Sequence, residues 1–409
     1  MSHPPRFLPE TISGWIDAVS DCGLTDKTIH TPAVLSSASK IGLDQFLLLR
    51  VIWKPDRPPL LLYRQLNLQD RANQAKQFLD HYTSWNTYCG SLHASAQIPE
   101  GTFALARHYQ LEVQHTKKDI DLTAFASPIK TRAMRRAERQ PQGIRGLQES
   151  QAHTHSKSPT RRTGNEEPFD VSEDEDLSSS EEEPSPYQLY SPVPSELINV
   201  LYPPTKDEQI VNTALIVFLN ALTIHTELTS AWTLHRRAFT AKFREAQFEA
   251  RTDGYLHDRD GKPSVIIEVK PVSRSGNPAI IQMQESAQMV AWILSDDESA
   301  QRRHQKRVHI AQDRHEIYVT VAEYNDHYLA YLNGTDVSST PPKDDTSFLK
   351  MHQYGPWNTL DVTHVRELGK LLLAITLRAE DEYRRNRWFQ LVGRFWMRVA
   401  HRATCESRK

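Results

Sequence analysis

The sequence predicts an α/β fold for the C-terminal part of the chain, because segments with strand and helix periodicity alternate along it. A short β-branched run bounded by turn residues, SVIIEVK at 264–270, is typical of a buried strand. An apolar stripe with helical spacing follows at 278–294, with Asn277 as its N-cap and Pro278 at its first position. A further apolar helix is expected at 205–226 and another from residue 362 to about 383.

The predicted strand 264–270 has one apolar face and one face that ends in charge. Val265, Ile267 and Val269 fall on the first face, and Glu268 and Lys270 on the second, because successive side chains of a strand alternate. A carboxylate and an ammonium group therefore emerge side by side at the end of an apolar strand.

The segment 246–256 also alternates, and Asp260-Gly261 after it is a favoured two-residue hairpin turn. A hairpin closed by that turn places Asp253 directly opposite Glu268. Opposed Cβ atoms are roughly 4.5 to 5.5 Å apart, close enough for two carboxylates to hold one divalent cation. Pro263 donates no ladder hydrogen bond, so it must lie at a non-bonded position or a bulge.

The helix 278–294 carries two amides beside its apolar stripe. Gln284 and Gln288 are four residues apart and share a face with Trp292. We expect the amides on that face to reach across to the strand ends.

At these residues the chain resembles the PD-(D/E)XK nuclease superfamily. Asp253 is followed after fourteen residues by Glu268-Val269-Lys270, and Thr252 stands where the motif has proline, which removes no ligand. Gln288 with Trp292 is similar to the glutamine-x-x-x-tyrosine motif of the exonuclease-like branches, with tryptophan in the tyrosine place. Phrases such as RTDGYL, IIEVKP and ESAQMVAWI resemble the fungal PD-(D/E)XK nuclease-like proteins over roughly residues 187–380.

The resemblance implies a restriction-endonuclease-like fold, a mixed central sheet flanked by helices in the order helix, three strands, helix, strands, helix. It also implies a metal-dependent nuclease that hydrolyses phosphodiester bonds with Mg²⁺ or Mn²⁺. In that scheme the metal ligands are Asp253, Glu268 and the backbone carbonyl of Val269. Lys270 orients or deprotonates the attacking water, and Gln288, with Gln284 behind it, hydrogen-bonds the water or a metal ligand.

Two alternatives stay open at this point. Glu208 is either an additional acid of the site, as on the first helix of many superfamily members, or the partner of Thr205 in a capping box. The domain is either an enzyme or a catalytically inactive module of the same fold that binds nucleic acid or protein. The intact carboxylates favour the enzyme.

Four segments are expected along the chain. Residues 1–128 form an uncertain N-terminal region, a small α+β unit or a set of partner-dependent segments, with a strand at 45–53 and a helix at 70–88. Residues 129–186 are expected to be a disordered linker, since they are first basic and then acidic and carry no apolar periodicity. The nuclease-like domain covers 187–383, and 384–409 form a helix and tail that interleave basic and aromatic residues.

Composition restricts the function classes. The 409 residues include 24 prolines, and the net charge of −2 averages a basic with an acidic segment. Neither a signal peptide nor a membrane span is recognisable, and the three cysteines have no metal spacing, so we expect reduced thiols and a nuclear or cytoplasmic location. Motifs of P-loop enzymes, zinc proteases and serine hydrolases are missing.

Nucleic acid, with DNA favoured, is the expected partner. The candidate phosphate contacts are Arg302, Arg303, Lys306 and Arg307, a basic run that also fits a solvated helix end.

Overall fold

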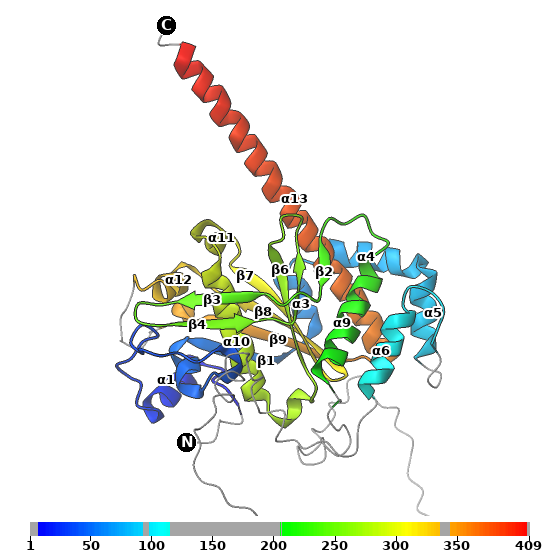
Figure 1. Cartoon of the computed structure of the whole chain (residues 1–409), viewed down its shortest axis with the longest axis horizontal. Helices are drawn as coiled ribbons and strands as arrows, with labels where there is room; N and C mark the ends of the chain where they lie inside the picture. Colours follow the sequence, from blue (N-terminus) through cyan, green and yellow to red (C-terminus); the bar gives the residue numbers. More distant parts are fainter. Residues whose placement is uncertain (1–6, 93–97, 115–204, 206, 336–343, 407–409) are drawn as a thin grey trace, which may run out of the picture. The chain divides into compact units, whose positions relative to one another are not determined.

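The computed structural model describes residues 7–92, 98–114, 205, 207–335 and 344–406, with side chains as far as residue 388 apart from residue 56. These residues belong to one compact unit to which both the N-terminal and the C-terminal parts of the chain contribute (Figure 1). The linker expected at 129–186 lies outside the described residues.

The unit is built on a seven-stranded mixed sheet with the order β1-β9-β8-β7-β6-β5-β2. The pairs β1–β9 and β6–β7 are parallel, and the other neighbours are antiparallel. Its strands are β1 (Val51–Arg57), β2 (Ala231–Thr233), β5 (Gly254–His257), β6 (Pro263–Lys270), β7 (Lys306–Asp313), β8 (Glu316–Glu323) and β9 (Leu349–Asn358). A separate two-stranded sheet consists of β3 (Ala238–Lys242) and β4 (Gln247–Arg251).

Helices cover both faces of the sheet, so the expected α/β class with a mixed, helix-flanked sheet is confirmed (Figure 1). The first face packs on α3 (Pro59–Gln65), α4 (Gln69–His81), α5 (Thr83–Ser91), α6 (Ala104–Gln114), α9 (Glu208–Thr223) and α13 (Val362–Glu406). The second face packs on α1 (Ile12–Asp21), α2 (Leu43–Leu48), α10 (Pro278–Ser295), α12 (Asp326–Leu332) and the β3–β4 hairpin. The short helix α11 (Glu298–Arg303) precedes β7. As predicted for β6, Val265, Ile267 and Val269 join the first core, whereas Ile266 joins the second.

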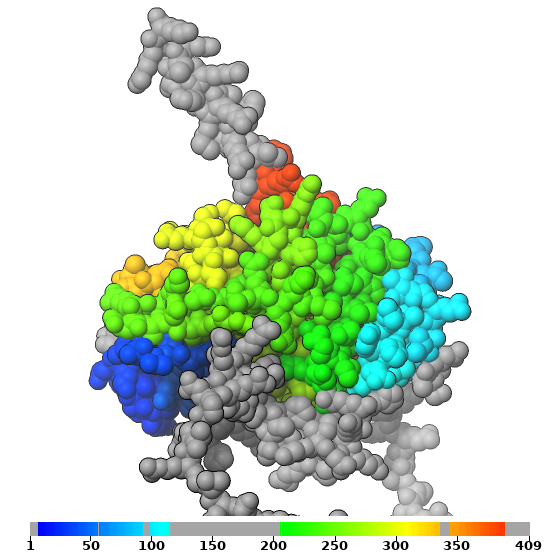
Figure 2. Space-filling model, in the orientation of Figure 1, coloured from blue at the N-terminus to red at the C-terminus, as the bar shows by residue number. Residues whose placement is uncertain are grey.

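The N-terminal residues are part of this fold rather than a separate unit. Strand β1 pairs with β9 at the edge of the main sheet, and α1 and α2 pack in the second core. Figure 2 shows the N-terminal residues, in blue, against the green β3–β4 hairpin, where His30 contacts Phe243 with 5.5 Å between ring centroids. A division of the folded unit at residue 187 is therefore not observed.

Several expected elements have different bounds or a different type. The strand expected at 45–53 is α2 followed by β1, because Arg50 adopts a positive φ of 51° that ends the helix and reverses the chain. The helix expected at 70–88 is broken at Tyr82 into α4 and α5. The last helix does not end near residue 383, since α13 continues through the expected tail to Glu406. No helix among the described residues is long and apolar enough to cross a membrane.

Gly369 offers a test of the packing between α5 and α13. A Cβ atom at this position would fall inside van der Waals contact with the indole of Trp85, which is 3% exposed and has little room to move. We expect Gly369→Ala to lower the free energy of unfolding by about 1–3 kcal/mol, although alanine ordinarily stabilises a helix interior by about 1 kcal/mol relative to glycine. Urea unfolding measures the change.

Gly90→Ala in α5 is the matched control for this test. A Cβ atom at residue 90 would meet nothing within 4 Å, so this substitution should be neutral or stabilising. Equal stabilisation by both substitutions would contradict the close packing of α5 on α13.

Candidate metal centre

Three carboxylates from three different elements converge at the end of β6. Glu208 lies at the start of α9, Asp253 immediately precedes β5, and Glu268 is the third-last residue of β6. One oxygen of each lies within 4.8 Å of the others. Among the described acids, histidines and cysteines, these three carboxylates are the group whose ligand atoms lie close enough together to hold a metal ion.

Glu208 reaches the site because the start of α9 is tied to the end of β6. The amide of Thr205 donates to the carbonyl of Pro271 at 2.9 Å. The expected capping box is wrong: Asp207 is the N-cap, and its side chain accepts from the amide of Gln209. Glu208 is the first helical residue, so its carboxylate is free to approach the Lys270 ammonium at 3.6 Å.

The register between β5 and β6 agrees with the prediction, although the turn differs. Gly254 pairs with Ile267, and the amide of Asp253 donates to the carbonyl of Ile267 at 2.9 Å. Asp258 bonds to Lys262 across a loop with one residue more than expected, and a bulge between Leu256 and His257 compensates for it. The extra turn residue and the bulge cancel at the site, and Pro263 lies at the bulge, as expected for a residue that donates no ladder hydrogen bond.

The chain changes sheets at the residue before Asp253. The segment 246–256, expected as one strand, is split into β4 and β5. The amide of Thr252 donates to the carbonyl of Arg237, just before β3, whereas the amide of Asp253 donates to the carbonyl of Ile267 in β6. This crossover directs the Asp253 side chain over the end of β6.

The two oxygens of Asp253 have different partners. Oδ2 accepts from the amide of Val269 at 3.2 Å, and Oδ1 lies 3.1 Å from Nη2 of Arg236. Asn212 of α9 donates to the backbone carbonyl of Asp253 at 2.9 Å. One oxygen is therefore fixed by the backbone, and the other faces a cation at the surface. A role for the Val269 carbonyl as a ligand remains a prediction.

Glu268 is 3% exposed and is held by the amides predicted to reach it. Gln284 donates to Oε1, and Gln288 donates to Oε2 at 2.5 Å. Lys270 also donates to Oε1. Gln288 Nε2 makes a second hydrogen bond, at 2.8 Å, to the carbonyl of Arg251. The amide face of α10 therefore positions Glu268 by holding both of its oxygens.

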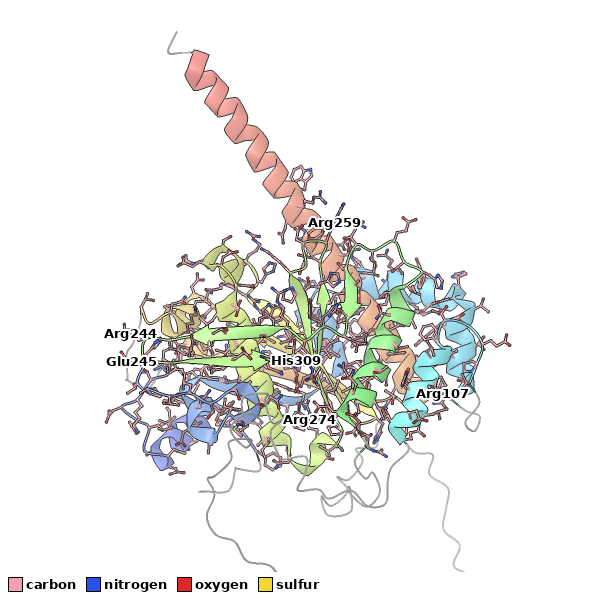
Figure 3. The ribbon with its side chains drawn as sticks, viewed as in Figure 1. Arg107, Arg244, Glu245, Arg259, Arg274 and His309 are labelled. Atoms are coloured by element: carbon pink, nitrogen blue, oxygen red, sulfur yellow. The ribbon has the colours of Figure 1, made fainter. Side chains whose placement is uncertain are left out.

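His309 completes this arrangement and carries no signal in the sequence. The residue is labelled in Figure 3. Its Nε2 lies 3.3 Å from Oε1 of Gln288. Burial, with Arg274 and Lys270 nearby, lowers the pKa of His309 to about 3, so the ring is neutral at physiological pH. A neutral ring that donates from Nε2 orients the Gln288 amide with its NH₂ group toward Glu268.

The cluster carries more negative charge than its surroundings neutralise. Burial and the neighbouring Asp253 raise the pKa of Glu268 to about 8, although Lys270 opposes the shift. Burial also raises the pKa of Glu208. Burial alone would lower the pKa of Lys270, but Glu268 and Glu208 raise it above its ordinary value. Lys270 is therefore a charged donor rather than a ready base at neutral pH.

These residues fit a hard divalent cation. Carboxylate oxygens are the ligands that Mg²⁺ and Mn²⁺ prefer. Ligand oxygens of one Mg²⁺ ion are separated by at most about 4 Å, twice the metal–oxygen distance. The three carboxylate oxygens lie within 4.8 Å of one another, so small side-chain movements bring them to this separation. Burial and the neighbouring negative charge raise the pKa of Glu268, and a bound cation would offset both effects.

A second buried charge cluster lies beside the centre and was not foreseen. Arg274 is 2% exposed, and its Nε lies 2.6 Å from Asp313 Oδ2, while its Nη groups contact Glu285 and Gln353 (Figure 3). These partners come from β7, α10 and β9. The guanidinium thus fixes the first turns of α10, which carry Gln284, against the sheet.

The predicted phosphate contacts are only partly available. Arg307 is buried, pairs with Asp296 at 2.8 Å and stacks over Trp292, which corrects its assignment to nucleic acid. Lys306 lies in β7 rather than in a helix, and its ammonium donates to the carbonyl of Gln65 at 3.1 Å. Arg302 and Arg303 are exposed at the end of α11. Trp292, in the tyrosine place of the motif, stacks on Arg307 instead of reaching the carboxylates.

The chain was compared with protein-family models, with curated proteins and with solved structures, and none of the three comparisons finds a match. The likeness of its motif to PD-(D/E)XK nucleases remains a prediction.

The raised pKa of Glu268 predicts a specific pH dependence of stability. The folded protein holds a proton on Glu268 up to a pH of about 8, whereas the unfolded chain releases it near 4.5. Protonation therefore stabilises the fold fully below about pH 4.5, and this contribution is lost as the pH rises to about 8. In EDTA, the free energy of unfolding of wild type should therefore decline over this range. The decline for Glu268→Gln should be smaller, and the two declines should differ by more than about 1 kcal/mol.

Urea unfolding of both proteins between pH 5 and 9, in the same buffers, measures the two curves. Parallel curves for wild type and Glu268→Gln would show that Glu268 does not carry the excess charge.

Proposed function

We propose that the protein is a metal-dependent nuclease. The observation that carries the proposal is the convergence of Glu208, Asp253 and Glu268 at one strand end, with the Lys270 ammonium in contact with two of them. Such a cluster fits one divalent cation together with a cationic donor beside it, a set of groups that can catalyse phosphodiester hydrolysis.

Each residue has a defined task in this proposal. Glu208, Asp253 and Glu268 hold Mg²⁺ or Mn²⁺, with the carbonyl of Val269 as a further ligand. A bound metal ion of this kind polarises the scissile phosphate and lowers the pKa of its water. Lys270 stays protonated because of its carboxylate neighbours, so it orients the water or neutralises charge that develops on the phosphate.

The amides act through Glu268 rather than on the substrate. Gln284 and Gln288 each donate to one oxygen of Glu268, which fixes the plane of the carboxylate. Oε2 accepts a single hydrogen bond from the described residues and keeps a lone pair for a metal ion, whereas Oε1 accepts from both Gln284 and Lys270. We assign the two glutamines as positioning residues of the centre.

The order of elements around the centre supports a restriction-endonuclease-like arrangement as part of the proposal. Helix α9, main-sheet strands β2, β5 and β6, helix α10 and strand β7 follow one another along the chain. DNA is the proposed substrate, with a nuclear or cytoplasmic site of action. The β3–β4 hairpin is an insertion between the first two of these strands.

The test is cleavage of labelled single- and double-stranded DNA and RNA in Mg²⁺, Mn²⁺ or EDTA. We expect cleavage of at least one substrate in metal and none in EDTA. Glu268→Gln should reduce the rate by on the order of 10²- to 10³-fold with nucleic-acid binding retained. Lys270→Met, which keeps most of the apolar stem, should have an effect of similar size.

Glu249→Gln is the matched control. Glu249 is exposed on β4 and pairs with Arg251, so the same change of charge occurs outside the carboxylate cluster. Its cleavage rate should equal that of wild type. Absence of metal-dependent cleavage of every substrate would refute the enzyme and favour an inactive module of the same fold.

A further inference from the structure

Arg236 faces the carboxylate cluster from the solvent side. It lies between β2 and β3, its side chain is 47% exposed, and its Nη2 is 3.1 Å from Asp253 Oδ1. Its charge also opposes the upward shift of the pKa of Glu208. The cluster thus contacts two cations in different surroundings. Arg236 is half-exposed, whereas the Lys270 side chain is 18% exposed and is held by Glu268 and Glu208.

The contact occupies the Asp253 oxygen that is not bonded to the backbone. Oδ2 already gives one lone pair to the amide of Val269, which leaves Oδ1 with more capacity for coordination. Arg236 Nη2 lies against that same Oδ1. A guanidinium in this position competes with a divalent cation for Oδ1, because the two positive charges repel each other at one carboxylate oxygen.

The backbone next to Arg236 is held by hydrogen bonds, whereas the Arg236 side chain is half-exposed and held by its ion pair with Asp253. The carbonyl of the next residue, Arg237, accepts from the amide of Thr252 at 3.0 Å, and the Arg237 side chain donates to the carbonyl of Gly261 at 2.8 Å. Arg236 can therefore leave Asp253 by side-chain rotation alone, and its Cα stays beside the cluster.

Charge balance indicates where the displaced guanidinium goes. Glu208, Asp253 and Glu268 carry three negative charges when ionised, which a divalent cation and Lys270 neutralise. Arg236 is then a surplus positive charge at the rim of the centre. A phosphodiester brings one negative charge and two oxygens, which match the paired donors of a guanidinium.

We infer that Arg236 is a cation that competes with the metal: it covers Asp253 Oδ1 in the metal-free protein, yields this oxygen to the metal, and then binds a phosphate of the nucleic acid. The first two steps concern metal binding alone. The last step rests on the proposed nuclease function.

The inference predicts opposite effects of one substitution on two affinities. In the full-length chain without nucleic acid, Arg236→Gln should bind Mn²⁺ roughly fivefold more tightly than wild type, because a competing ion pair of partly exposed groups is removed. With Ca²⁺ in place of Mg²⁺ to prevent turnover, the same variant should bind a labelled DNA duplex roughly tenfold more weakly, because a charged hydrogen bond to phosphate is lost. Calorimetry measures the first affinity and fluorescence anisotropy the second.

Arg259→Gln is the matched control, since this exposed arginine lies at the β5–β6 turn, at the other end of the hairpin from Glu268 (Figure 3). It should change neither affinity. Equal or weaker Mn²⁺ binding by Arg236→Gln would overturn the competition, and tighter Mn²⁺ binding with unchanged DNA binding would overturn the phosphate contact.

A third variant separates this inference from the proposed function. Asp253→Asn should abolish Mn²⁺ binding. If it binds Mn²⁺ as wild type does, the metal centre itself is refuted, whereas loss of binding in Asp253→Asn with no change in Arg236→Gln refutes only the role of Arg236.

Discussion

The burial of the Glu268 carboxylate is the constraint on which the arrangement of the site depends. An ionised carboxylate removed from water is costly unless its oxygens receive charged or hydrogen-bonded partners. Glu268 receives two amides from α10 and an ammonium from its own strand. Even so, its pKa stays well above the ordinary value, because the group is buried and Asp253 lies across the hairpin. These partners thus compensate the buried charge of Glu268 only in part, and a divalent cation would supply the missing positive charge.

The same constraint explains the polar layer behind the site. Gln288 donates to Glu268 while His309 contacts its amide oxygen, which keeps the NH₂ group directed toward the carboxylate. The turns of α10 that present Gln284 are in turn fixed by Arg274, whose partners Glu285 and Asp313 are both buried. Burial raises the pKa of both acids despite the guanidinium between them. The structure therefore contains two adjacent buried clusters with excess acid, one closed off and one that opens to Arg236 and solvent.

The N-terminal residues support the centre indirectly. They add β1 to the far edge of the main sheet, and α1 and α2 pack in the core shared by α10 and the β3–β4 hairpin. On the other face, α5 and α6 pack with α9 and α13. Because α9 and α10 carry Glu208, Gln284 and Gln288, the first part of the chain contributes to holding the elements that bring these side chains to β6.

The sequence by itself determined the local geometry of the site. The alternation of β6 separates Val269 from Glu268 and Lys270, and the hairpin places Asp253 beside Glu268 even though its turn is one residue longer than expected. The helical spacing of Gln284 and Gln288 brings both amides to one side of the helix. These features follow from the periods of strands and helices and from turn chemistry, which act over a few residues.

Only the tertiary structure decided what approaches the strand end from elsewhere. Glu208 and Arg236 reach Asp253 and Lys270 through the packing of α9 and the crossover between the two sheets, and no periodicity in the sequence specifies either. The burial of Arg307, expected at a nucleic-acid surface, follows from the position of β7 next to β6 under Trp292. The pairing of β1 with β9 joins residues about three hundred positions apart. Such contacts depend on which surfaces of distant elements fit together, and local sequence patterns do not encode that fit.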